Sequence, residues 1–390
     1  MTFKAAVLSI DGGGIKGIVP AMILAAIEDK TGKPICELFD FIAGTSTGGI
    51  LALGLTRPSE EDSTKPKFTA KELVNLYRKE GRIIFQRREN KKLNVFHKKV
   101  LKAILDKFAP EVKAEDLFSR KYTRKGKEDV INNYLGDTCI EKALTEVLIT
   151  SYATNFRKPI FFTNNLKKEQ EYETSQCFRV ICKGYKMRDA ALATSAAPTY
   201  FKPYRIDTIN HRDKEYTLVD GGVFANNPTS IAIIEAMNSY KAKTGDNISL
   251  DDLLVVSVGT GRKVRGLDIK DIAGWGQIKW IEPLIDMTLN GQSEVVDYQM
   301  EQLLSTKLQN KTQDQQQYYR FQPQYSETKN SKEYSISGNA FIYVNDNMDD
   351  ASDDNISNLL GAANRFIDME RENLERLSTQ LLTIKAQFNK

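Results

Sequence analysis

The beginning of the chain has an apolar run that leads through glycines into a longer run with helical periodicity. Residues 5–10 (AAVLSI) are almost continuously apolar, which predicts a buried strand, and DGGG at 11–14 interrupts the pattern. From residue 15 to 31 apolar side chains recur at helical spacing, and Gly32 is a typical residue at the end of a helix. This order predicts a strand, a glycine turn and a helix.

A second unit of the same kind follows at once. Residues 39–43 (FDFIA) predict a short strand, GTSTGG at 44–49 predicts a turn, and ILALGL at 50–55 predicts the start of a buried helix. Because successive units of this kind place their strands side by side in one direction, the two units predict a parallel sheet.

Later apolar runs extend this pattern. Further strands are predicted in residues 157–164, 177–185, 216–222 and 253–260, and a helix ending near Pro198 is predicted in residues 187–201. We therefore expect an α/β fold, a three-layer α/β/α core with a mainly parallel sheet, in a single domain that spans residues 1–390.

The residues after 262 are expected to form a C-terminal extension, 263–390, packed on that core. It holds Trp275 and Trp280, which we interpret as core residues, with insertion into a lipid interface as the alternative. The Asp-rich stretch 344–355 lacks the glycine of a calcium-binding EF-hand loop, so we interpret it as a solvated region before a final helix from about Asn355.

Composition excludes several classes of protein. The 390 residues are 41% hydrophobic and 27% charged, which is typical of globular proteins, and no stretch of 18 apolar residues occurs. The four cysteines form no CxxC pair, which argues against a disulfide framework and a zinc site. With no signal peptide evident at the first residues, we expect a cytoplasmic protein without a metal or other cofactor.

Positive charge is concentrated in one stretch. From Arg57 to Asp129 there are 21 basic and 12 acidic residues, a net charge of +9, and apolar residues in 101–108 have helical spacing. We expect a basic, helical insertion at 58–130. It could rest on anionic lipid headgroups, at about 1 kcal/mol per basic residue, or be a solvated helix face. It has no nucleic-acid-binding motif, so no nucleic acid partner is expected.

The strongest chemical signal is a GxSxG sequence between a predicted strand and a predicted helix. Gly44, Ser46 and Gly48 have the spacing of a nucleophile elbow, in which a strained turn lifts the serine hydroxyl to the start of a helix. A serine that only caps the helix is the alternative. We predict that Ser46 is a nucleophile.

The glycine loop before this elbow supports the prediction. Consecutive glycines in DGGGIKG (11–17) leave backbone N–H groups unshielded, so that they can converge on a developing oxyanion. The same residues match GxGxxG, the fingerprint of dinucleotide binding. Against that reading, Asp11 would lie beside a pyrophosphate, and the next strand leads to GTSTGG instead of the acidic residue that binds the ribose.

A serine nucleophile needs a base, and the chain has only two histidines. His97 lies in the basic stretch and His211 in a polar loop, whereas Asp220 ends a predicted strand and is followed by two glycines. We predict that Asp220 is the base. Partial burial that raises its proton affinity would suit this role, and a tight turn is the alternative for DGG.

Together, DGGGIKG, GTSTG and DGG, in this order and each after a predicted strand, resemble the patatin-like phospholipase family. Members of this family use a Ser–Asp dyad. Residues 187–201, with a SAAP element, and 273–300 are similar to further family segments, so the resemblance covers most of the chain. Lys16 departs from it, because many relatives have arginine there and lysine lacks the planar fork for binding an anion.

The resemblance implies roles for named residues. Ser46 is similar to the family's nucleophile and Asp220 to its catalytic aspartate. The remaining matched positions are the oxyanion loop, Gly12, Gly13 and Gly14, and the supporting motif residues Asp11, Lys16, Gly17, Gly44, Gly48, Gly221 and Gly222. The implied reaction is hydrolysis of a fatty-acyl ester bond in a phospholipid, lysophospholipid or galactolipid through an acyl-serine, without a metal.

Two alternatives to this activity stay open. The chain could be a Ser–His–Asp esterase that uses His211, or a catalytically silent regulator that binds lipid or a nucleotide on the same fold. By resemblance to some bacterial relatives, it could also be latent and switched on by a small-molecule activator. Contact with the inner membrane surface would be peripheral.

Overall fold

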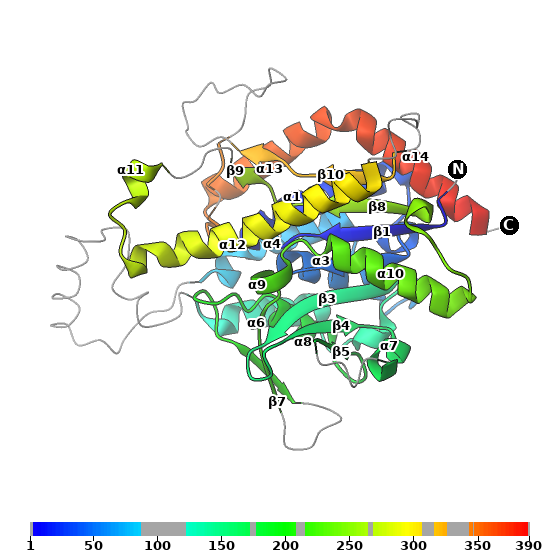
Figure 1. The fold of residues 1–390 in the computed structure, drawn as a ribbon, viewed down its shortest axis with the longest axis horizontal. Coiled ribbons are helices and arrows are strands. Elements are labelled where there is room, and N and C mark those ends of the chain that lie inside the picture. Colours follow the sequence, from blue (N-terminus) through cyan, green and yellow to red (C-terminus); the bar gives the residue numbers. More distant parts are fainter. Residues whose placement is uncertain are drawn as a thin grey trace.

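The computed structural model describes residues 3–86, 122–171, 177–207, 215–263, 268–305, 316–325, 343–345 and 347–388. Figure 1 shows a central sheet with helices on both sides. The main path of the sheet has the order β10–β8–β1–β2–β3–β4–β5. The bounds are β1 Ala5–Ile10, β2 Phe41–Gly44, β3 Glu146–Ala153, β4 Lys158–Thr163, β5 Arg179–Ile181, β6 Tyr204–Asp207, β7 Glu215–Asp220, β8 Leu253–Val258 and β10 Tyr318–Phe321.

The sheet is mainly parallel. β1 pairs in parallel with β2 and β8, β2 with β3, and β8 with β10, whereas β3 pairs antiparallel with β4 and β7. The two units predicted at the start of the chain thus place β1 beside β2, with Ile10 opposite Gly44. The carboxyl ends of both strands meet at one edge of the sheet, where each continues into a glycine turn.

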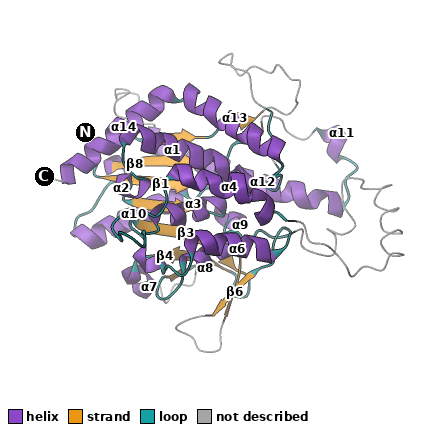
Figure 2. Ribbon diagram, turned by 180° about the vertical axis from the view of Figure 1, so that it is seen from behind, coloured by secondary structure: helices purple, strands orange, loops and turns teal. Residues whose placement is uncertain are grey.

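Alternate residues of the strands pack against two different helical layers. In β1, Leu8 and Ile10 belong to a large core with helices α1, α3, α4, α6, α8, α13 and α14, which are in front in Figure 2. Val7 points to a smaller core on the opposite face, which contains residues of α10 and the end of α12. The predicted three-layer α/β/α fold is therefore confirmed.

The helices begin and end as follows. The large-core layer has α1 Ile18–Thr31, α3 Thr47–Thr56, α4 Ala70–Ile84, α6 Arg124–Leu135, α8 Met187–Thr194, α13 Asp353–Met369 and α14 Arg371–Phe388, and the opposite layer has α10 Thr229–Thr244 and α12 Gln277–Met300. Shorter elements are η1 Gly14–Gly17, α2 Ile35–Leu38, η2 Ile140–Lys142, α7 Leu166–Glu171, α9 Gly222–Ala225, η3 Leu250–Asp252, β9 Arg262–Lys263, α11 Ile269–Ile272, η4 Glu301–Ser305 and β11 Gln324–Tyr325.

Residues of the expected extension take part in the central structure. β10 extends the main sheet beyond β8, and α13 and α14 pack against α1. Of the expected basic insertion, α4 and α6 are described and contact each other, and α4 also packs on α1. The apolar positions 101–108 lie outside the described residues.

The core interpretation of the two tryptophans is wrong. Trp275 precedes α12 and Trp280 lies in its first turns, both are only half-buried, and their rings pack edge to face with centroids 5.4 Å apart. They contact each other because the chain bends before α12 begins, so a helical spacing does not apply to them. Within the described ranges, no helix has the length and apolar character needed to cross a membrane.

Candidate active site

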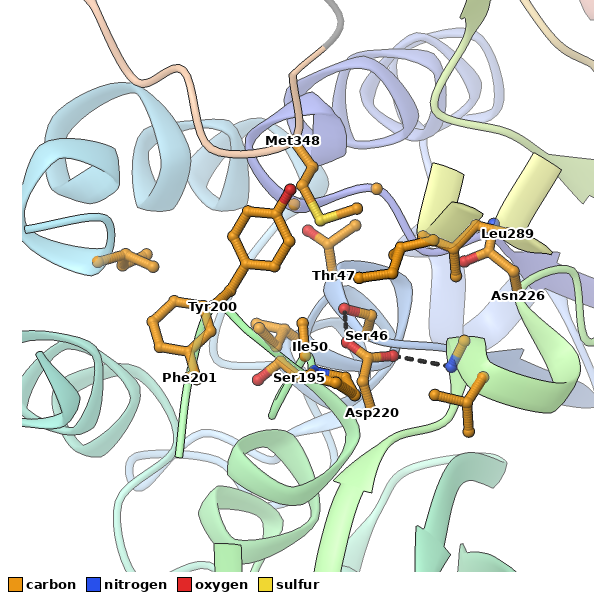
Figure 3. A pocket seen from close by; sticks show the side chains of 18 of the residues that line it. Ser46, Thr47, Ile50, Ser195, Tyr200, Phe201, Asp220, Asn226, Leu289 and Met348 are labelled. Carbon is orange, nitrogen blue, oxygen red and sulfur yellow. Dashed lines mark hydrogen bonds between the residues drawn. The ribbon is translucent and has the colours of Figure 1, made fainter. Parts of the chain in front are cut away.

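Ser46 and Asp220 lie in contact, although 174 positions separate them in the sequence. The Ser46 hydroxyl donates a hydrogen bond of 2.6 Å to Oδ2 of Asp220, and Oδ1 of Asp220 accepts one of 2.8 Å from the Gly222 N–H (Figure 3). Both oxygens of the carboxyl group are therefore held, and the one bound to Ser46 faces the hydroxyl that it would deprotonate.

Strand β3 sets the separation of the two residues. It pairs with β2 so that Ile149 is opposite Gly44, and with β7 so that Ser151 is opposite Asp220. Two residues along a strand span about 7 Å. Because Ser46 follows Gly44 by two residues, side chains from β7 and from the turn after β2 can meet above the end of β3.

The turn that carries Ser46 is strained. Ser46 has φ 53° and ψ −120°, a conformation that residues with side chains rarely adopt and that is often found at active sites. The glycines on either side are required by space: a Cβ on Gly44 would lie 2.4 Å from the Gly48 carbonyl oxygen, and one on Gly48 would lie 2.2 Å from that of Ile10. The GxSxG sequence therefore forms a tight elbow between β2 and α3.

Residues 194–196, at the end of α8, hold both sides of the pair. Oγ1 of Thr194 accepts a hydrogen bond of 2.8 Å from the Ser46 N–H, and the Thr194 carbonyl accepts one of 3.3 Å from Gly221. The Ala196 carbonyl accepts one of 3.1 Å from the Asp220 N–H. We call residues 194–196 the bracket, because this one segment fixes the backbone of both Ser46 and Asp220.

The N–H groups of the three loop glycines differ in whether a described residue accepts a hydrogen bond from them. The Gly12 N–H donates to the Asn226 carbonyl at 3.1 Å, and the Gly12 carbonyl accepts from the Thr260 hydroxyl at 3.0 Å. Among the hydrogen bonds of the described residues, none involves the N–H of Gly13 or Gly14. Both of these residues line the same cavity as Ser46, so their amides stay candidates for the predicted oxyanion loop.

A segment from the far end of the chain covers this loop. The Met348 carbonyl accepts a hydrogen bond of 2.9 Å from the Ile15 N–H, and a Cβ on Gly14 would lie 2.1 Å from that carbonyl oxygen. The Met348 side chain also lines the cavity (Figure 3). Ser352 caps α13, so a helix begins close to the predicted position. Met348, in the stretch interpreted as solvated, packs on the glycine loop instead.

A buried ion pair anchors the loop at its first residue. Arg320 of β10 binds both carboxylate oxygens of Asp11, at 3.0 and 2.6 Å, and also donates to the Ser257 hydroxyl at 2.9 Å. Burial alone would lower the pKa of Arg320, but the groups around it, Asp11 above all, together more than offset this and raise the pKa. The guanidinium therefore stays charged and ties β10 to the end of β1.

The electrostatic setting of Asp220 favours a base that works near neutral pH. Burial raises the pKa of Asp220, and the hydrogen bonds from Ser46 and Gly222 and the positive charge of Lys127 offset only part of this rise. The resulting pKa is about 6. A carboxyl group with an ordinary pKa would be a much weaker base, since proton transfer is most efficient when the pKa lies near the working pH.

A cavity of about 200 Å³ opens beside the pair. Its walls are mostly apolar side chains from α3, α6, the segment after α8, α12 and the residues before α13. Ile50, Phe201, Leu289 and Met348 are among them (Figure 3), as are Ile131 and Leu284. An apolar chain gains about 0.8 kcal/mol for each CH₂ group that leaves water. The cavity therefore favours a ligand with a hydrocarbon chain.

Comparison with known proteins agrees with these features. The family model for patatin-like phospholipases matches residues 8–233. The chain belongs to the patatin-like phospholipase family. It is 32% identical over 317 residues to "Patatin-like protein 2" of Arabidopsis thaliana, covering 75% of this chain and 70% of that one.

Other relatives extend the match over more of the chain. This patatin-like chain is 30% identical over 384 residues to "Patatin-like protein 2" of Oryza sativa subsp. indica, covering 93% of this chain and 83% of that one. It is also 32% identical over 309 residues to "Probable inactive patatin-3-Kuras 1" of Solanum tuberosum, covering 75% and 72%.

The structure describes some of the other residues predicted for this patatin-like protein. Lys16 is buried in η1. A Cβ on Gly17 would lie 2.2 Å from the Thr47 hydroxyl, and one on Gly221 would lie 2.2 Å from that of Thr150. His97 and His211 lie outside the described residues.

Sequence reasoning missed five residues that shape the site. They are Lys127, Thr194, Asn226, Arg320 and Met348. Thr194 stands just before the SAAP element that was recognised, so that element could have pointed to it. The other four lie in stretches without a motif.

We predict that Arg320→Met lowers the free energy of unfolding by about 3–5 kcal/mol, because it leaves the Asp11 carboxylate buried without its partner. Urea denaturation measures this change. Arg262→Met is the matched control: Arg262 pairs with Glu294 at 3.0 Å in solvent, with 41% and 60% of the side chains exposed, so we expect a loss of about 1 kcal/mol or less.

A loss for Arg320→Met no larger than that for Arg262→Met would contradict this account of the ion pair. If Arg320→Met does not fold, Asp11→Asn/Arg320→Met provides the test. The double variant has no orphaned charge, so it should recover part of the lost stability.

Proposed function

We propose that this patatin-like protein is an active lipid acyl hydrolase with Ser46 as nucleophile and Asp220 as base. The hydrogen bond of 2.6 Å between the two side chains, at the wall of an apolar cavity, is the observation that carries the proposal. Lipid acyl hydrolysis is the activity typical of the family. The dyad and the roles below are our inference from the geometry.

The reaction would run in two halves. Asp220 removes the hydroxyl proton as Ser46 Oγ attacks the acyl carbonyl carbon, and the negative charge moves to the carbonyl oxygen. Collapse of this intermediate breaks the bond to the alcohol oxygen, which takes the proton back from Asp220 and leaves as the lysolipid or alcohol. Water, deprotonated by Asp220, then attacks the carbonyl carbon of the acyl-Ser46 ester. Collapse of this second intermediate breaks the bond to Ser46 Oγ, which takes the proton back from Asp220, and the fatty acid is released.

The N–H groups of Gly13 and Gly14 would stabilise the oxyanion in both halves. One such donor contributes about 2.7–4 kcal/mol to the transition state. A carboxylate with a pKa of about 6 is a weaker base than the imidazole of a triad. Donors fixed in advance by the contacts of the loop with Asn226, Thr260 and Met348 would supply the difference.

The substrate class follows from the cavity. Its apolar walls fit a fatty-acyl chain, so we infer a phospholipid or a related glycerolipid such as a galactolipid, bound with its acyl carbonyl at Ser46. Profiling the lipids of membranes incubated with the wild type and with Ser46→Ala would identify which class loses acyl chains.

We also infer peripheral contact with a membrane through one face of α12. Ile281, Leu284 and Met287 are exposed there, and Leu284 also lines the cavity, so an acyl chain could pass from a bilayer into the cavity along apolar side chains. In Figure 1 this end of α12, with α11 beyond it, extends past the sheet. The four cysteines are unpaired, which fits the cytoplasm and its inner membrane surface.

We expect Ser46→Ala and Asp220→Asn each to lower ester hydrolysis by about a thousandfold or more, since each removes a member of a unit that acts together. His211→Ala should retain activity, whereas a Ser–His–Asp esterase would lose several orders of magnitude. Assays use a soluble short-chain ester, with thermal unfolding to show that each variant is folded. Activity retained by Asp220→Asn would refute the dyad.

Labelling with a fluorophosphonate separates an enzyme from a silent binding protein. An adduct on Ser46, located by peptide mass spectrometry, is expected in the wild type, because the hydroxyl is activated by Asp220. No adduct and no hydrolysis of any lipid would favour the silent regulator.

Activity should fall as the pH is lowered through about 6, because Asp220 must be ionised to accept the proton and burial has raised its pKa to that value. The acidic limb of kcat/KM reports this pKa in the free enzyme. A limb near pH 4 would show that Asp220 has an ordinary carboxyl pKa and would contradict the burial argument.

Ile281→Glu/Met287→Glu should weaken binding to phosphatidylcholine vesicles by about tenfold or more, since each exposed apolar side chain that leaves water contributes about 1.5 kcal/mol or more. Binding is measured by vesicle sedimentation in the Ser46→Ala protein, which separates it from hydrolysis. Leu166→Glu on α7 is the control, because Leu166 is 45% exposed, as Met287 is, and lies away from the cavity. Equal effects would contradict a specific membrane face.

A further inference from the structure

The described part of the basic insertion brings one lysine to the catalytic pair. Lys127, on α6, is 5% exposed and lines the same cavity as Ser46 and Asp220. Among the described residues that line this cavity, Lys127 is the only basic side chain and Asp220 the only acidic one. Nothing in the family motifs points to this lysine.

The contacts of Lys127 fix its position. Nζ donates a hydrogen bond of 2.6 Å to the carbonyl of Ser195, the middle residue of the bracket, and lies 4.0 Å from the centroid of the Phe201 ring. A carbonyl at the carboxyl end of a helix and the face of an aromatic ring both attract a cation. These contacts offset part of the cost of burying the charge.

The bracket connects Lys127 to both members of the pair. Thr194 binds the Ser46 amide and Ala196 binds the Asp220 amide, and the Ser195 carbonyl between them is held by Lys127. Without the Lys127 ammonium, the Ser195 carbonyl would lose this hydrogen bond, and the bracket would hold the backbone of Ser46 and Asp220 less firmly. Loss of the ammonium would also remove the positive charge that acts on Asp220 across the cavity.

We propose that Lys127 is a positioning residue of the hydrolase, which holds the bracket behind Ser46 and Asp220 and keeps the Asp220 carboxylate charged. This inference rests on the proposed dyad, because it assigns Lys127 a role through Asp220. It also gives the basic insertion a function in the site that does not require contact with lipid headgroups.

The surroundings of Asp220 support an effect of this charge. Burial raises the pKa of Asp220, and the ammonium of Lys127 lowers it together with the Ser46 hydroxyl from α3 and the Gly222 N–H from α9. Two tyrosines, Tyr77 of α4 and Tyr200, also line the cavity. Burial raises the pKa of Tyr77, so it stays neutral when Asp220 titrates. A charge in a buried site acts strongly, because little solvent screens it.

The test compares Lys127→Met with Lys127→Arg. Lys127→Met keeps most of the side-chain volume but no charge, so the acidic limb of kcat/KM for a soluble ester should move up by about one pH unit. Lys127→Arg should bring the limb back towards the wild-type position. Lys125→Met, which removes an exposed charge two residues earlier on α6, should leave it unchanged.

A second measurement does not depend on activity. The titration of the Asp220 carboxyl carbon, followed by NMR in Ser46→Ala with and without Lys127→Met, should show the same upward shift. If the wild type hydrolyses no ester at any pH, the proposed function fails, and the NMR titration still tests Lys127. A folded Lys127→Met protein with an unshifted limb and an unshifted Asp220 titration would overturn the proposal.

Discussion

The hydrogen bond between Ser46 and Asp220 depends on one constraint, the position of strand β3 between β2 and β7. Gly44 pairs with Ile149 and Asp220 pairs with Ser151. The register of β3 with its two neighbours therefore sets the distance between the turn that carries Ser46 and the strand that ends in Asp220. β2 is parallel to β3 and β7 antiparallel to it. The two catalytic candidates can therefore approach from strands of opposite direction and meet above one strand end.

Polar contacts inside the sheet reinforce this arrangement. The buried hydroxyls of Thr45 and Thr150 lie 2.7 Å apart, and the Ser151 hydroxyl donates to the Val219 carbonyl at 2.8 Å. The first contact joins β3 to the residue before Ser46, and the second joins β3 to the residue before Asp220. Buried hydroxyls cost free energy unless they find partners, so these contacts favour one register of the strands.

The same contacts explain what the sequence pattern could and could not predict. β1, β2 and β8 are nearly continuous apolar runs followed by glycines, and this local pattern is enough to identify them. The end of α1 is identified in the same way by Gly32, which has φ 67°. β3 reads EVLITSYA, and its glutamate, threonine and serine obscure the apolar run. Their partners are supplied by distant segments, which a local pattern does not contain.

The residues of the candidate site also fall into two groups, those with a local sequence signature and those without one. Ser46, Asp220 and the loop glycines were predictable because each needs a local turn of particular shape, and turns leave a signature in neighbouring residues. Asn226, Arg320 and Met348 act on the glycine loop through contacts from distant parts of the chain. A lone arginine in a Gln-rich stretch, or a methionine in an Asp-rich one, has no neighbour in the sequence that would indicate its role.

These long-range contacts also bear on how the glycine loop can work. An amide stabilises an oxyanion only if it is held in place before the charge forms, since reorientation during the reaction would cost part of the benefit. The loop is bound by Asn226, Thr260, Met348 and, through Asp11, by Arg320, which come from four separate segments. Glycine makes the loop able to approach Ser46, but glycine alone would leave it free to move. The residues after 262 supply two of the four anchors, so they contribute to the rigidity of the site as well as to the sheet.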